Sequence, residues 1–326
     1  MNQPIRLELP TPFSIGSVNG WLFKDPEPTL VDCGQKTDDC INTLVDGLAE
    51  HGLTLSDLKK VIITHGHVDH AGLGGYLAER CDAEFWVSDL CWDWVADPLG
   101  MWHKRTDFMH DVAIKGGMAP ETAAAITSAM KHMNQIWDAV PVERMARFTS
   151  QDKLQMGGDE WDVIEAPGHS STQTCFYEPG TGRLISADML LPIAPVPVIE
   201  RYAEEDEDGK AVRIPGLLQF MDSLKLFYEL DVSTVYPGHG DIFADPHTVV
   251  IDRQRDRIAM RKQQCLNLVT QGKQNANDIV DVMYAHFPPE SRITGFAMVI
   301  GYLDLLLADK SITREEIDGI WYFSPA

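Results

Sequence analysis

Potential metal ligands are concentrated in one short segment of the chain. Residues 65–70 have the sequence HGHVDH, which contains three imidazoles and one carboxylate. Imidazole nitrogens and carboxylate oxygens are ligands that a borderline divalent ion such as zinc accepts. A single histidine is often a hydrogen-bonded core residue, but that explanation is poor for four ligand-type residues in one turn. The segment therefore predicts a metal site.

Further histidines and aspartates follow short apolar runs elsewhere in the chain, both before and after residues 65–70. His169 and His239 each come directly after Pro-Gly at the end of such a run, and Asp188 ends another one. Asp32 follows the run Thr29–Val31 in the same way. Because each run is typical of a β-strand, we expect the strand ends to bring these side chains to one rim of the fold.

The HGHVDH segment itself lies between two predicted elements. The β-branched run Val61–Thr64 before it predicts a buried strand, and we expect a helix to start at Ala71 after it. A turn from strand to helix can hold the side chains between them rigidly at the edge of a sheet.

The ordered set of these residues resembles the motifs of the metallo-β-lactamase superfamily over roughly residues 10 to 245. The resemblance implies an α/β fold, the αββα sandwich, in which two mixed sheets face each other with helices outside. It also implies a first metal held by His65, His67 and His169, a second held by Asp69, His70 and His239, and Asp188 as the bridge. Asp32 would then orient a ligand without binding metal itself.

A centre of two divalent ions would supply a nucleophile at neutral pH. Ions about 3.5–4 Å apart can share a bridging hydroxide, because metal binding lowers the pKa of water from about 15.7 to about 7. The ligand types favour zinc, with manganese or iron as alternatives. Asp69 and Asp188 are the candidate catalytic residues, and Asp69 is our candidate for protonating the leaving group.

Differences from other branches of the superfamily narrow the predicted reaction. Class B β-lactamases carry Cys at the position of Asp188, and flavodiiron proteins usually carry an acid at the position of His67. The resemblance therefore favours the thioesterase, lactonase and esterase group, which includes glyoxalase II-like enzymes. We predict a metal-dependent hydrolase that acts on a small apolar acyl ester, lactone or thioester. The alternatives are an RNA phosphodiesterase, a mononuclear iron dioxygenase and a non-enzymatic metal-binding protein.

The chain is predicted to contain two domains. Residues 1–245 would form the catalytic domain, with a helical insert at about 89–150, and residues 246–326 would form a small winged-helix-like domain. The insert is rich in Trp and Met, which could either pack the helices or line an apolar cap over the metals. Trp102 and Met133 are candidate lining residues, and the proline-rich run 192–197 is expected along the mouth of the site.

Local signals define the elements of the C-terminal region. We expect one helix from the cap Asp245-Pro246 to Gly272, a second one capped by Asn275, and a third over Phe296–Ala308. Asp318-Gly319 predicts the turn of a final β-hairpin.

Composition limits the partners and the compartment. The net charge of −22 argues against nucleic acid and acidic membranes, and residues 246–326 hold nine Lys and Arg against ten Asp and Glu. The six cysteines contain no CxxC pair, and the chain shows neither a signal peptide nor a long apolar run. We therefore expect a cytoplasmic protein with a small-molecule acyl substrate, no nucleic-acid or membrane partner, and a homodimer as one option for its assembly.

Overall fold

The computed structural model describes residues 3–131, 136–191, 199–207, 209, 211–244, 246–287 and 289–326. Three sequence predictions lie outside these residues: Met133 as a lining residue, the path of residues 192–197, and Asp245 as a helix cap.

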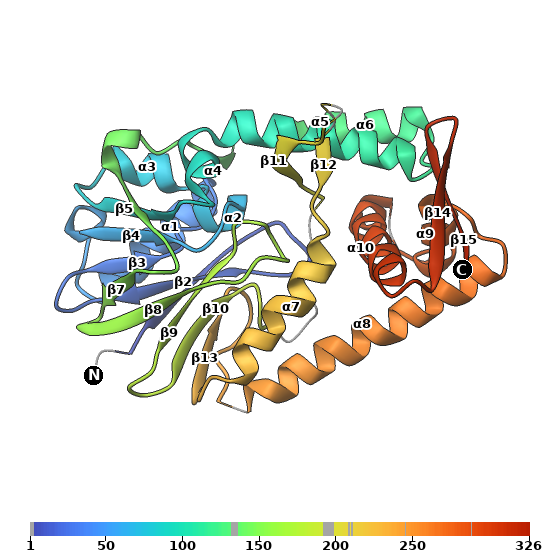
Figure 1. Ribbon diagram of the computed structural model, residues 1–326. Helices are drawn as coiled ribbons and strands as arrows, with labels where there is room; N and C mark the ends of the chain where they lie inside the picture. The colour runs from blue at the N-terminus through green and yellow to red at the C-terminus, as the bar shows by residue number, and fades with distance from the viewer. Residues whose placement is uncertain are drawn as a thin grey trace.

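Two mixed β-sheets lie face to face (Figure 1). The first has, in sheet order, the strands β1 (Ile5–Leu9), β2 (Val18–Phe23), β3 (Thr29–Val31), β4 (Lys60–Ile63), β5 (Glu84–Ser88) and β6 (Met145–Phe148). The second has the order β13 (Thr234–Pro237), β10 (Arg183–Ala187), β9 (Thr174–Glu178), β8 (Asp159–Glu165) and β7 (Lys153–Met156). Pairing is parallel from β3 to β6 and between β13 and β10, and antiparallel elsewhere in both sheets.

Consecutive residues of strand β4 are apolar and do not alternate with polar ones. Ile62 packs between the two sheets, next to Trp21 and Phe176, whereas Val61 and Ile63 pack under the helices of the first sheet. Both faces of the strand are therefore buried, as in most parallel sheets. This confirms the strand predicted before the HGHVDH turn.

Helices cover the outer faces of both sheets. Helix α1 (Asp38–Glu50) and the short helices α2 (Val68–Ala71) and α3 (Gly74–Ala78) pack on the first sheet, and α7 (Gly216–Tyr228) packs on the second (Figure 1). The αββα sandwich implied by the resemblance is confirmed. Short 3₁₀ helices at Leu55–Asp57 and Val142–Arg144 and the strand pair β11 (Arg201–Glu205) and β12 (Ala211–Arg213) complete this part of the chain.

The segment predicted as an insert contains helices α4 (Trp92–Ala96), α5 (Pro98–Lys115) and α6 (Pro120–Lys131). Its last residues differ from the prediction, because Met145–Phe148 is strand β6 at the edge of the first sheet. Helices α5 and α6 extend from the sandwich toward the C-terminal helices (Figure 1).

The C-terminal region has three helices and a hairpin: α8 (His247–Thr270), α9 (Ala276–Met283), α10 (Pro289–Ala308), β14 (Ile312–Ile317) and β15 (Ile320–Pro325). Asn275 caps α9 as predicted by accepting the Asp278 N–H at 2.9 Å. Asp318 and Gly319 both have a positive φ, 50° and 79°, which the tight hairpin turn requires. The third helix begins earlier than expected, at Pro289 and not at Phe296.

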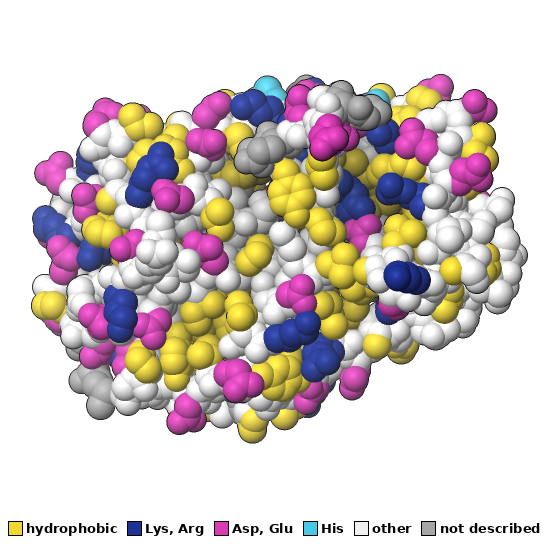
Figure 2. All heavy atoms as spheres, in the orientation of Figure 1, with side chains coloured by type: hydrophobic (Ala, Val, Ile, Leu, Met, Phe, Trp, Pro, Cys, Tyr) yellow, Lys and Arg dark blue, Asp and Glu magenta, His cyan; other side chains and the backbone are white. Residues whose placement is uncertain are grey.

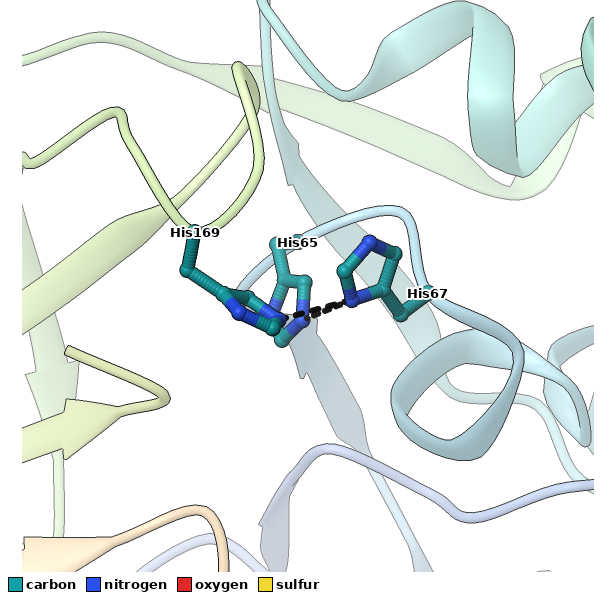
Figure 3. A group of neighbouring side chains, drawn as sticks. All are labelled: His65, His67 and His169. Atoms are coloured by element: carbon teal, nitrogen blue, oxygen red, sulfur yellow. Dashed lines mark hydrogen bonds between the residues drawn. The ribbon is translucent and has the colours of Figure 1, made fainter. Parts of the chain in front are cut away.

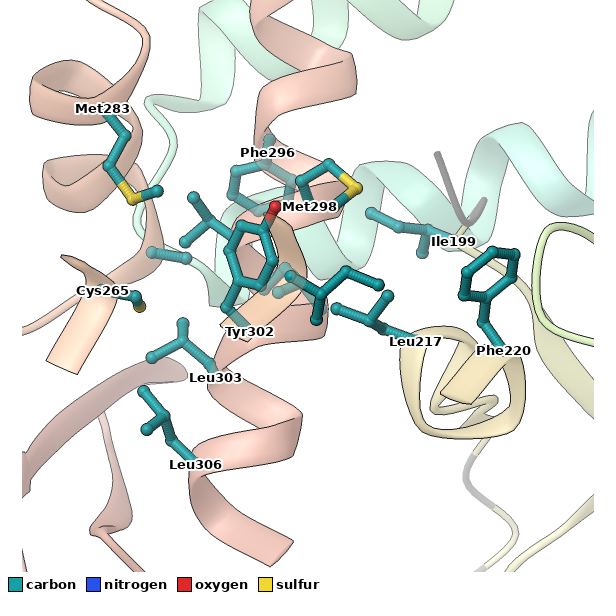
Figure 4. Packing of buried hydrophobic residues seen from close by; sticks show 14 of the residues in the cluster. Ile199, Leu217, Phe220, Cys265, Met283, Phe296, Met298, Tyr302, Leu303 and Leu306 are labelled. Carbon is teal, nitrogen blue, oxygen red and sulfur yellow. The ribbon is translucent and has the colours of Figure 1, made fainter. Parts of the chain in front are cut away.

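A single apolar cluster joins this region to the rest of the molecule. Phe296, Leu303 and Leu306 of α10 pack with Leu217 and Phe220 of α7 (Figure 4). Met109 and Val112 of α5 belong to the same cluster. The C-terminal region thus packs against both the sandwich and the insert. All six cysteines are buried and free, and none of the described helices has the length and apolarity needed to cross a bilayer.

Candidate metal centre

The HGHVDH turn joins β4 to α2, and its four ligand-type side chains point into one buried space. His67 is the N-cap residue of α2, so Asp69 and His70 lie in its first turn. The helix predicted from Ala71 therefore begins earlier, and it is interrupted after Ala71. Gly72 at the interruption lies so close to other backbone that a Cβ atom would be 2.8 Å from Gln35 Cα.

Three histidines from two distant segments converge at one point (Figure 3). The distance from His67 Nδ1 is 3.0 Å to His65 Nε2 and 2.9 Å to His169 Nε2. His169 lies on the loop between β8 and β9, more than a hundred residues after His67. The structure therefore brings together the three histidines that the resemblance assigned to the first ion.

A second group lies beside the first one. Suitable ligand atoms of Asp69, His70 and His239 all lie within 4.8 Å of one another. Asp188, at the end of β10, lies between the two groups. Its carboxylate is 3.3 Å from His169 Nε2 of the first group, and 3.5 Å from His70 Nε2 and His239 Nε2 of the second.

Hydrogen bonds fix the histidine rings from behind. Asp32 accepts hydrogen bonds from the Thr64 N–H and hydroxyl, and its Oδ2 is 2.8 Å from His70 Nδ1. The Ser17 carbonyl is 2.8 Å from His239 Nδ1 in the same way. Both rings therefore present Nε2 to the centre, an arrangement that the supporting partners of ligating histidines commonly produce. Asp32 was predicted from the sequence to orient a ligand, whereas Thr64 and Ser17 were not predicted, although Thr64 directly precedes His65.

The close packing around Asp188 explains the glycine before His239. A Cβ atom at Gly238 would be 2.1 Å from Asp188 Oδ1 and 3.0 Å from His70 Cε1. Any side chain there would displace the carboxylate that lies between the two groups. The glycine of the Pro-Gly-His sequence is thus required by this close approach.

The electrostatics of the two groups differ. Burial, together with the neighbouring imidazoles, lowers the pKa of His65 and His67 well below the ordinary range, and burial also lowers that of His169. Burial also acts to lower the pKa of His70 and His239, but the opposite effect of nearby carboxylates is larger. Asp188, Asp32 and Asp69 raise the pKa of His70, and Asp188 and Asp69 raise that of His239 to about 10.

We expect metal binding at the second group to release protons. Because their pKa values are raised, His70 and His239 carry protons at pH 7 in the metal-free protein, and both must lose them to ligate an ion. The first group has neutral imidazoles and should release few. Affinity at the second group should therefore rise with pH across the neutral range. Calorimetry at pH 7 in buffers of different ionisation enthalpy measures the protons released, about two per second ion.

A His239→Ala variant is the control for this measurement, since it should lose roughly one released proton along with affinity at the second group. Heats that do not depend on the buffer would show that these imidazoles are already neutral.

The side chains fit divalent ions. His70 Nε2 and Asp188 Oδ1 are buried and have no hydrogen-bond partner in the described part of the chain. The nitrogens of three neutral imidazoles also face one another at about hydrogen-bond distance in the first group. Buried polar atoms are seldom left unpaired, and cations bound by these atoms would account for both observations.

Comparison with known proteins identifies the family. The sequence model that describes the metallo-beta-lactamase superfamily matches residues 15–239, which is more than half of the chain. The chain belongs to the metallo-beta-lactamase superfamily. The match includes all of the histidines and aspartates described above and ends before the C-terminal helices.

Relatives that match nearly the whole chain are also found. A protein of Bacillus subtilis (strain 168) named "Probable metallo-hydrolase YqjP" is 26% identical over 324 residues, 98% of this chain and 97% of the relative. The metallo-beta-lactamase family protein TTHA1429 from Thermus thermophilus has a TM-score of 0.80 at 21% identity, covering 99% of this chain and 98% of that one. A beta-lactamase domain protein from Burkholderia ambifaria has a TM-score of 0.79 at 24% identity, covering 98% and 92%. The two structures confirm the fold along the whole chain.

Replacing Asp32 with Asn should weaken metal binding without destroying the site. The amide can still accept a hydrogen bond from Thr64, but it loses the charge that orients and polarises His70. Changes of such supporting partners typically cost about 10–100-fold in affinity or activity. Competition with a chromophoric chelator measures the affinity. An affinity equal to that of the unmodified protein would contradict the orienting role of Asp32.

Proposed function

We propose that the chain hydrolyses a small apolar acyl ester, lactone or thioester at a centre of two divalent ions. The chain is a metal-dependent hydrolase of the metallo-beta-lactamase superfamily, and the proposal adds the number of ions, their ligands and the substrate class. The ligands would be His65, His67, His169, Asp69, His70, Asp188 and His239. The observation that carries the proposal is the position of Asp188, whose carboxylate lies within 3.5 Å of histidines from both groups.

Divalent ions bound there would lower the pKa of a water molecule and polarise the scissile carbonyl. Zinc is the metal that we propose from the ligand types, with manganese or iron as alternatives. The residues of the chain would hold and orient the reactants. Asp32 and the Ser17 carbonyl fix the rings of His70 and His239, and the buried surroundings exclude bulk water.

Asp69 is suited to transfer a proton to the leaving group. Burial raises the pKa of its carboxyl, but His70 and His239 outweigh this effect and lower it below the ordinary value. The carboxylate is therefore ionised at neutral pH and can accept a proton from the attacking water. Passing that proton to the leaving alkoxide or thiolate would complete the cleavage.

The insert contributes less to an apolar cap than its composition suggests. Trp94 and Trp137 are buried and stack on each other with ring centroids 5.8 Å apart, and Met109 and Met118 lie in the core shared with the C-terminal helices. These residues pack the helices, which was the alternative to the cap. Trp102 is only half-buried and remains the candidate for contact with the acyl group.

A substrate panel with metal analysis tests the proposal. Protein loaded with zinc, manganese or iron would be assayed on a thioester, a lactone, an alkyl ester and bis-p-nitrophenyl phosphate. We expect carbonyl substrates to be cleaved and the phosphodiester to be inert, with His169→Ala as the inactive control.

Three outcomes of the panel would contradict the proposal. Cleavage of the phosphodiester alone would support an RNA phosphodiesterase. One iron per chain with oxygen consumption would support a mononuclear iron dioxygenase. Two metals without turnover of any substrate would support a non-enzymatic metal-binding protein.

Charge argues against a nucleic-acid substrate. Acidic residues outnumber basic ones by 49 to 27, and Lys and Arg are interspersed with Asp and Glu on the face shown in Figure 2. Binding to phosphates would gain little from counterion release at such a surface. The absence of a nucleic-acid or membrane partner, the option of a homodimer and the cytoplasmic location stay predictions.

A further inference from the structure

Arg105, on helix α5, lies partly buried beside the metal centre, and it has no charged partner among the residues that the structure describes. Its Nε is inaccessible and makes no hydrogen bond to the described residues, and its guanidinium forms no ion pair with them. Burying a guanidinium in this way is costly unless something binds it.

Aromatic contacts place the guanidinium on the side of His67. Its Cζ is 5.2 Å from the ring centroid of Trp102 and 6.0 Å from that of Trp94. Trp94 in turn packs on the HGHVDH turn itself, since a Cβ atom at Gly66 would be 2.6 Å from Trp94 Cβ. The charge of Arg105 adds to burial in lowering the pKa of His67, which also indicates that the two side chains are close.

A carboxylate from another segment, Glu200 just before β11, is bonded to the loop of His169 on the same side. Glu200 is buried, and its Oε2 accepts the Ser171 N–H at 2.8 Å. Its Oε1 has no hydrogen-bond partner among the described residues. Glu200 opposes the effect by which burial lowers the pKa of Arg105, yet the two do not form a direct ion pair. Within the described part of the chain, donors on Arg105 and one acceptor on Glu200 thus have no partner.

The tryptophans compensate only part of the cost of burying this charge. A cation–π contact contributes about 0.5–2 kcal/mol, less than the penalty for an unpaired buried ion. The chain has 49 acidic residues, and the buried Arg183 and the partly buried Arg213 are both paired with carboxylates. A guanidinium held rigidly by two rings with its donors free is suited to bind an anionic oxygen group.

We propose that Arg105 binds a carboxylate of the substrate, separate from the scissile bond, on the side of His65, His67 and His169. Trp94 and Trp102 hold the plane of the guanidinium, and Glu200 Oε1 accepts a hydrogen bond from the same ligand or from water. That the bound molecule is a substrate rests on the proposed function. It narrows that function to acyl compounds that also carry a negative charge.

Binding of simple dicarboxylates tests the site without turnover. Malonate, succinate and glutarate, and their neutral diamides, would be titrated calorimetrically into metal-free and metal-loaded protein. We expect at least one diacid to bind roughly 10–100-fold more tightly than its diamide, the range for a lost charge-assisted hydrogen bond. Arg105→Gln should remove this difference in the metal-free protein too, and Arg105→Lys should keep part of it.

Arg255→Gln, at an exposed arginine beside Tyr228, is the matched control and should bind the diacids normally. Metal content should be unchanged in every variant. Inorganic phosphate would be titrated in the same way. Tighter binding of phosphate than of every diacid would overturn the carboxylate assignment. Equal binding of each diacid and its diamide to the unmodified protein would overturn the site itself.

A pair of esters connects the site with catalysis. Mono-p-nitrophenyl glutarate and p-nitrophenyl pentanoate have acyl chains of equal length, but only the first carries a carboxylate. Arg105→Gln should lower kcat/KM for the glutarate ester by roughly 10–100-fold and leave the pentanoate unchanged. Equal losses on both esters would mean that Arg105 is structural. If neither ester is cleaved while diacid binding depends on Arg105, the proposed hydrolase function fails and the anion site stands.

Discussion

Replacing Asp188 with Ala is expected to abolish hydrolysis and to reduce the metal bound at both groups of ligands. The carboxylate lies within 3.5 Å of both His169 and His70, one from each group. It is buried, and the histidines lower its pKa well below the ordinary value against the effect of burial, so that it carries a charge at every working pH. Its removal leaves the positive charge of two ions without their shared counter-charge.

Elemental analysis and hydrolysis assays on the purified variant measure the two effects. Asp188→Asn should behave almost as Asp188→Ala, because the amide keeps the shape but loses the charge. Asp162→Asn on β8, an aspartate 3.2 Å from Lys153, is a control that should retain both metals and full activity. An Asp188→Ala protein with both metals and its activity would show that the bridging assignment is wrong.

Metal removal should have the second large effect. We expect close to two ions per chain, since seven ligands are available and one of them, the Asp188 carboxylate, can bridge the ions. A chelator should reduce hydrolysis to the background rate and also lower stability, because the buried aspartates and histidines then lack the cations that balance them. An ion held at a free concentration of about 1,000 times its Kd stabilises the native state by about 4 kcal/mol. Tm should therefore fall by on the order of 10 °C or more.

Calorimetric scans before and after chelation, followed by scans with zinc, manganese or iron restored, measure this effect. Recovery of both Tm and activity with two equivalents of one metal would identify the ion that the site prefers. Saturation with a single ion after growth in excess zinc would contradict the dinuclear centre. A Tm that does not change on chelation would show that the site contributes nothing to folding.

The family and most of the local structure were predictable from the residues alone. Each of the ligand-type residues stands at the end of an apolar run or in the first turn of a helix, where neighbouring residues fix its backbone. The Asp318-Gly319 turn and the Asn275 cap were predictable for the same reason, since their hydrogen bonds and φ angles are set within four residues. Helix starts were less predictable: α2 begins before Ala71 and α10 before Phe296. His67, the N-cap residue of α2, makes no side-chain capping hydrogen bond, so no local capping signal marks that start.

Contacts between side chains that are far apart in the sequence could be seen only in the tertiary structure. His67 and His169 come together although 102 positions separate them, and Ser17 reaches His239 across 222. The tryptophans of the insert could have lined a cap, but two of them are buried in packing, and a pattern of residue types does not specify which face is covered. The guanidinium of Arg105, which has no ion pair with the described residues, had no signal in the sequence at all. Whether a charge has a partner depends on every element that packs around it, and those long-range contacts leave no local pattern in the chain.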